Sequence, residues 1–250
     1  MKWIGSTVQA TCVAAVLLAA LVPPAAVAQG ADAKWRNVRV IQVKPDRQAA
    51  WITLQKEMNA AMKKTGQSRD IWQVARGNVD TFHIGTTLSN LGQNDSTAEN
   101  ALGAERFASW ALQVAQCVGD RQVLTIRQRP ELTIPPKDGR VPQLAVLALR
   151  TVIPGKRAEY ESYLKNDYIP AMKKAKADGV FVNRIFMGEN PDTYAVVNFI
   201  DKWSEFDSGH PLVRDLGEQK ANTIFQKGSA LIQSSENVVL RYRPDLSVQP

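Results

Sequence analysis

The chain has 250 residues, with 31 lysines and arginines against 24 aspartates and glutamates, and a formal net charge of +7 at pH 7. A mildly basic chain without an arginine-rich arm or a recognisable reading helix fits solubility, or contact with anionic envelope polymers, better than nucleic-acid binding. We therefore expect no nucleic-acid partner.

The first 28 residues predict an export signal. Lys2 precedes an apolar run from Val13 to Val22, and small residues at Ala26 and Ala28 suit a cleavage site. Pro23 and Pro24 interrupt the run, which is too short to anchor the chain in a bilayer. We expect cleavage after Ala28, no membrane span, and a periplasmic or secreted location.

Cleavage would remove one of the two cysteines, Cys12, and leave Cys117 alone. An intramolecular disulfide is then impossible. Cys117 follows Trp110 and Val114 at helical spacing, a pattern typical of a buried thiol rather than a nucleophile.

The mature part contains an internal repeat. RQRPELT at 127–133 returns as RYRPDLS at 241–247, and four further anchors recur in the same order. These are Ala61-Met-Lys-Lys64 with Ala171-Met-Lys-Lys174, Asp80-Thr-Phe82 with Asp192-Thr-Tyr194, Leu102-Gly103 with Leu216-Gly217, and the stripe ending at Cys117 with the one ending at Leu231. We predict a first repeat over 36–134, a proline-rich linker over 135–143 and a second repeat over 144–247.

Each repeat predicts the order strand, helix, strand, strand, helix, strand. In the first repeat the expected elements are 38–43, 47–64, 71–76, 81–87, 99–118 and 121–129. In the second they are 144–152, 156–176, 180–187, 193–200, 212–233 and 236–243. Pro170 falls inside the second repeat's first helix and should kink or break it, either opening a cavity or simply ending the helix.

A βαββαβ order predicts an α+β fold, a ferredoxin-like antiparallel sheet with both helices on one face. The other face of each sheet is left bare. The two repeats are therefore expected to pack their sheets together into a dimeric-type α/β barrel within one chain.

The chain resembles the dimeric α/β-barrel superfamily, which includes antibiotic-biosynthesis monooxygenase-like, EthD-like and NIPSNAP-like proteins. The resemblance rests on the element order, on the turn Gly188-Glu-Asn-Pro-Asp192, and on Phe199-Ile-Asp-Lys-Trp203 leading toward His210. It implies a small-molecule pocket. In haem-handling relatives a histidine is an axial ligand, which makes haem an alternative cofactor here.

Candidate catalytic residues are His83, Arg76 and Asn183. His83 replaces Ala195 of the second repeat, so the fold itself does not require an imidazole there. The structural alternative is a strand histidine satisfied by a neighbouring carbonyl. His210, before Pro211, could instead be a helix cap.

Candidate ligand-binding residues are the larger polar and aromatic side chains of the strands and helices. They are Trp72, Tyr194, Tyr242, Tyr163, Tyr168 and His210, with Arg184 and Gln128 as further strand positions and Trp51 and Tyr160 as helix positions that ordinary packing would also explain. No CxxC, HxxxH, HExxH or GxSxG spacing occurs, so no metal site or nucleophilic triad is predicted.

The sequence leaves the activity open. One hypothesis is an exported small-molecule-binding protein, acting as a monomer with an internal barrel or as a homodimer. The alternatives are a cofactor-free monooxygenase acting on a flat aromatic substrate, in which His83, Arg76 or Asn183 would stabilise an anion, and a haem-binding protein.

Overall fold

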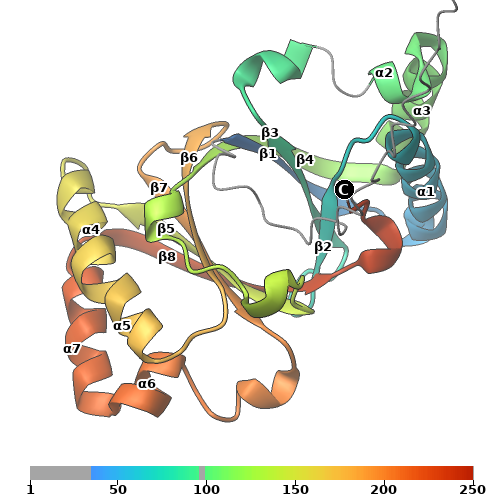
Figure 1. The fold of residues 1–250 in the computed structure, drawn as a ribbon. Coiled ribbons are helices and arrows are strands. Elements are labelled where there is room, and N and C mark those ends of the chain that lie inside the picture. Colours follow the sequence, from blue (N-terminus) through green and yellow to red (C-terminus); the bar gives the residue numbers. More distant parts are fainter. Residues whose placement is uncertain (1–34, 96–98, 250) are drawn as a thin grey trace, which may run out of the picture.

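The computed structural model describes residues 35–95 and 99–249. The predicted export signal, including Cys12, lies outside the described residues. Two copies of the βαββαβ unit are present, and their strands join into one antiparallel ring (Figure 1). The α+β class and the barrel predicted from the repeat are confirmed.

The strands of the first repeat are β1 (Trp35–Val43), β2 (Asp70–Val74), β3 (Thr81–Leu88) and β4 (Val118–Gln128). Its helices are α1 (Gln48–Lys64), α2 (Glu99–Leu102) and α3 (Ala104–Cys117). The strands of the second repeat are β5 (Leu144–Val152), β6 (Val180–Met187), β7 (Thr193–Ile200) and β8 (Ile232–Tyr242). Its helices are α4 (Arg157–Tyr163), α5 (Ile169–Lys174), α6 (Pro211–Leu216) and α7 (Glu218–Ser229).

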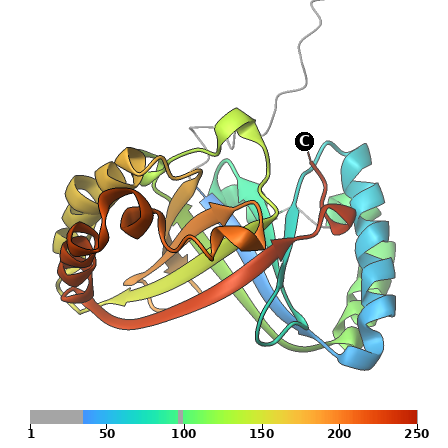
Figure 2. The same cartoon turned by 90° about the horizontal axis from the view of Figure 1, so that it is seen from below.

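The strand order around the ring is β1-β3-β2-β8-β5-β7-β6-β4. Two seams, β2 with β8 and β4 with β6, join the repeats. Each seam pairs three or four residues, whereas β1 with β3 and β5 with β7 each pair eight. The helices of each repeat cover the outside of their own half of the barrel, so the two helical layers lie at opposite ends of the molecule (Figure 2).

Alternation along the strands gives each half-sheet an outer face toward its helices and an inner face toward the other half. Trp51 and Phe82 pack on the outer face of the first repeat, and Tyr160 and Tyr194 pack on that of the second. Inside the barrel, Trp72, Leu147, Ala195 and Leu240 form one apolar cluster.

The repeated RPELT and RPDLS motifs exchange between the halves. Leu132, at the end of the first repeat, is buried in the core under the second repeat's helices, while Leu246 is buried in the core of the first. Equivalent backbone bridges, Ile134 to Val180 and Arg69 to Val248, extend the two seams. The arginines just before these motifs, Arg129 and Arg243, pair with Glu131 and Asp245 as expected.

Two predicted helices are wrong in their continuity. The helix predicted over 99–118 breaks at Gly103, and the one predicted over 212–233 breaks at Gly217, because both glycines adopt positive φ angles of 77° and 83°. The second of these helices also ends at Ser229, so that β8 starts at Ile232, four residues earlier than predicted.

Pro170 neither ends the helix nor sharply redirects it. A π-helical turn over Leu164–Tyr168 joins α4 to α5, and the Ile169 N–H bonds the Leu164 carbonyl. The equivalence of Trp51 with Tyr160 implies an offset of 109 residues, whereas Ala61 with Ala171 implies 110. The wider turn therefore accommodates a one-residue insertion just before a proline that has no N–H to donate.

Candidate functional site

The structure divides the predicted site residues between two places. Trp72, His83, Asn183 and Tyr242 lie on strand faces that point into the barrel. Trp72 is the cross-strand partner of both His83 and Tyr242, and the ring centroids of Trp72 and Tyr242 are 5.1 Å apart. Asn183 donates to the Ala195 carbonyl at 3.4 Å, and Trp72 packs in the interior cluster. Much of this set therefore serves as packing.

A polar group accompanies His83 inside the first half of the barrel. Arg36 forms an ion pair with Asp70, and Asp70 also accepts the indole N–H of Trp72 at 2.8 Å. Gly85 leaves the space that the Arg36 guanidinium occupies. Burial lowers the pKa of His83 to about 4, so its imidazole is neutral at pH 7.

The remaining tyrosines lie outside the barrel, between α4, α5 and the second half-sheet. The ring of Tyr160 is 5.9 Å from that of Tyr163 and 5.0 Å from that of Tyr194. Tyr168 donates to Asn198 at 3.2 Å, and burial raises its pKa to about 12. This cluster is packed and protonated at neutral pH.

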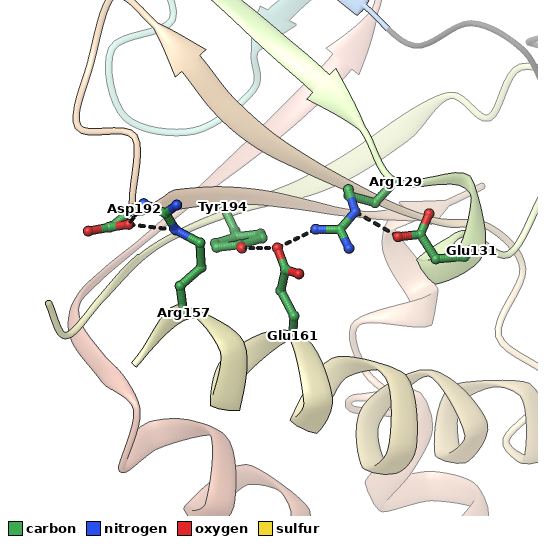
Figure 3. Close-up of polar contacts among 6 residues, drawn as sticks. All are labelled: Arg129, Glu131, Arg157, Glu161, Asp192 and Tyr194. Atoms are coloured by element: carbon green, nitrogen blue, oxygen red, sulfur yellow. Dashed lines mark hydrogen bonds and ion pairs between the residues drawn. The ribbon is translucent and has the colours of Figure 1, made fainter. Parts of the chain in front are cut away.

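A charged network borders the tyrosine cluster, and Figure 3 shows its members. Glu161 of α4 accepts hydrogen bonds from the Arg129 guanidinium and the Tyr194 hydroxyl. Partial burial opposes ionisation of Glu161, but the donors outweigh it and lower the pKa of this carboxyl. Burial and the bond to Glu161 raise the pKa of Tyr194. Glu161 is thus a carboxylate held by two donors.

Arg157 and Asp192 form a second pair at the start of α4 (Figure 3). The equivalent residues of the first repeat, Gln48 and Asp80, are also hydrogen-bonded. The contact ties the first turn of the helix to the turn between two strands in both repeats. Its primary role is therefore structural.

An open groove of about 430 Å³ lies beside this network. It is lined by Gly155, Arg157, Ala158, Glu161, Arg184 and Asp192. Among the described residues no hydrogen bond or ion pair reaches Arg184, and its Nε atom is closed off from solvent without a partner. A half-buried guanidinium without an acceptor is costly, which makes Arg184 the outstanding feature of the groove.

The lining departs from the repeat at the positions that carry its polarity. Strand register and helix offset place Arg184 where the first repeat has Gln73, Tyr194 where it has Phe82, and Glu161 where it has Ile52. Glu161 was not among the predicted site residues. A comparison of the two helices at the offset of Trp51 and Tyr160 could have identified it, because glutamate replaces isoleucine there.

Three other candidates lie elsewhere. Arg76 is exposed and stacks over Trp203, with 4.4 Å from Cζ to the ring centroid, so it joins neither group. His210 caps α6, because its Nδ1 accepts the Leu212 N–H at 3.2 Å. Tyr163 borders a second groove of about 470 Å³ on the other side of α4, toward Lys227 of α7.

The ring of eight strands with helices outside defines a dimeric α/β barrel, here formed by a tandem duplication within one chain. No family model and no curated protein sequence matches the chain. Its fold is nevertheless shared with solved structures that span most of its length.

One similar structure is a candidate monooxygenase from Lactobacillus acidophilus NCFM, with a TM-score of 0.60 and 9% identity over 87% of this chain and 96% of that one. Another is an anthrone oxidase-like protein, with a TM-score of 0.60 and 10% identity over 85% and 92%. A cyanide-bound variant of the chlorite dismutase from Candidatus Nitrospira defluvii gives 0.51 and 7% over 87% and 94%. At these identities the likeness establishes the fold alone.

Because haem was an alternative for this fold, we tested the residues against it. Neither histidine lines either groove. His83 faces the barrel interior beside Trp72, and His210 uses Nδ1 as a cap while its ring packs edge-on against Phe225 at 5.1 Å. The grooves thus offer no imidazole ligand, and the residues do not fit haem there.

Within 35–95 and 99–249, no cluster of three or more histidine, cysteine, aspartate or glutamate side chains could hold a metal ion. No helix of that part of the chain is long and apolar enough to cross a membrane.

Proposed function

We propose that the protein binds a small molecule in the groove beside α4, and that it does so after export, as the leader-like first 28 residues indicate. The observation that carries the proposal is the departure from the repeat. Two copies of one unit need the same core to fold, yet the second copy replaces Gln73, Phe82 and Ile52 by Arg184, Tyr194 and Glu161 around an open groove. Polarity that the fold does not require is typical of a binding site.

The barrel interior supports this role less well. Its predicted ligand-binding residues Trp72 and Tyr242 contact one another, and Trp72 also stacks with Phe199 at 5.9 Å. The monooxygenase alternative would require a substrate beside the neutral imidazole of His83, and the apolar cluster around Trp72 fills that neighbourhood. We therefore favour binding at the groove over chemistry in the barrel.

The proposal is tested by blocking the groove. Ala158 is exposed and lines it, and its repeat equivalent in α1, Ala49, is exposed too. The wild type, Ala158→Trp and Ala49→Trp would be purified as the mature chain and screened by native mass spectrometry and thermal shift against small aromatic acids, phenols and amides. Ligands should bind to the wild type and to Ala49→Trp but not to Ala158→Trp. Equal binding to both variants would contradict the proposal.

A further inference from the structure

Arg184 carries a charge that its surroundings do not balance. Four arginines gather on this outer face: Arg127, Arg129, Arg157 and Arg184. Only three carboxylates face them, those of Glu131, Glu161 and Asp192. Arg129 takes Glu131 and Glu161, and Arg157 takes Asp192, so Arg184 is the cation without a partner among the described residues.

The strand register makes this position more unfavourable. Arg184 lies directly opposite Arg127 across the seam between β4 and β6, and like charges in that arrangement repel. Arg127 lies over the Trp35 ring, 5.6 Å from Cζ to the centroid. At the equivalent place in the other seam, Arg241 faces Gln73, whose amide oxygen accepts from Arg243. Only the second repeat has an arginine facing an arginine.

We infer that the groove is selective for a small organic molecule carrying an oxyanion, with Arg184 as the residue that binds it. This inference rests on the proposed function and names its ligand class. A carboxylate or phosphate oxygen would supply the acceptor that the guanidinium lacks and relieve its repulsion with Arg127. Ala158 and Gly155 form a wall on which an apolar body could lie.

Glu161 sets a limit on where the anion binds. Its carboxylate also lines the groove and would repel a second one, although the donors Arg129 and Tyr194 partly neutralise it. An oxyanion is therefore expected at the Arg184 side. The same geometry predicts that neutralising Glu161 strengthens anion binding, an effect that a purely structural role for this network would not produce.

The test uses benzoate and its neutral analogue benzamide as probes, titrated into the mature chain and followed through the backbone amide NMR signals of α4. Benzoate should bind more tightly than benzamide. Arg184→Gln, which installs the residue of the first repeat, should weaken benzoate binding about tenfold or more. Glu161→Gln should strengthen it, and Arg47→Gln, on an exposed arginine beside Asp46, should leave it unchanged.

The outcomes separate the two proposals. If neither probe perturbs α4 at saturation, both the groove and its anion selectivity are wrong. If both probes bind with similar affinity, or if Arg184→Gln leaves benzoate binding unchanged, the groove is a binding site but the oxyanion inference is overturned. Circular dichroism of Arg184→Gln would show that any loss is not unfolding, since Gln73 demonstrates that the fold accepts glutamine there.

Discussion

His83 shows how one side chain can make stability depend on pH. Burial lowers its pKa to about 4 in the folded protein, whereas an unfolded histidine titrates near 6.5. Between these values the unfolded chain binds more protons than the folded one, so folding weakens as pH falls through that window. Above pH 6.5 the imidazole is neutral in both states and the effect disappears.

We expect the free energy of unfolding to drop by about 1–2 kcal/mol more in the wild type than in His83→Ala between pH 7 and pH 4.5. The full shift would correspond to about 3 kcal/mol, but His83 is not entirely closed off from solvent. Urea unfolding at the two pH values measures the difference, and His210 is common to both proteins and cancels. Parallel losses in the two proteins would contradict a buried neutral imidazole.

The two repeats differ at the residue scale in a way that the sequence made visible for some positions and hid for others. His83 opposite Ala195, and Tyr194 opposite Phe82, could be identified because short anchors align them. Glu161 could not be found by its own pattern, because an acidic residue on an amphipathic helix is usually solvated. Its meaning depends on Arg129, 32 positions away, and only the folded chain brings the two together.

At the scale of elements, α7 approaches α4 through a glycine. A Cβ atom at Gly228 would lie 2.6 Å from Cζ of Tyr163, closer than real contacts allow. The first repeat has Val114 at the equivalent place, where the facing residue is Leu54 rather than tyrosine. The pair Gly228 and Tyr163 therefore appears to the fold as a swap of small for large across one interface.

Gly228→Ala is expected to destabilise the protein by about 1–3 kcal/mol through overpacking, despite alanine's higher helix propensity. Adding Tyr163→Leu should remove the clash, so that alanine at 228 becomes stabilising in that background. A double-mutant cycle from thermal or urea unfolding measures the coupling. Additive effects of the two substitutions would show that the helices do not meet at this point.

The strands of the second repeat were predicted with their observed bounds for β5, β6 and β7, because uninterrupted apolar runs end there at glycine or polar turns. The helices were less predictable. Gly103 and Gly217 lie within periodic stretches, and periodicity alone continues through a glycine whose positive φ angle breaks the helix. The π turn was equally hidden, although the change of offset from 109 to 110 marked its place.

At the scale of the molecule, the barrel depends on two short seams. Separated from the second repeat, the first would expose the edges of β2 and β4, the inner face around Trp72, and a core lacking Leu246. Unpaired edges and an uncovered apolar face are templates for association.

A fragment of residues 36–134 is therefore expected to form a homodimer with a second copy of itself in place of the missing repeat. Size-exclusion chromatography with light scattering measures its mass, and the intact mature chain serves as the comparison. A stable, folded monomer of the fragment would show that the inner face of one sheet does not need a partner.

The exchange of Leu132 and Leu246 also bears on how the chain is made. The first half of the protein emerges from the ribosome with its core unfinished, because the leucine that seals it stands only five positions from the last residue of the chain, Pro250, and lies among the last residues translated. The second half, by contrast, receives its leucine before its own strands exist. Translation thus supplies one plug early and the other at the very end, and the N-terminal core cannot close until synthesis is complete.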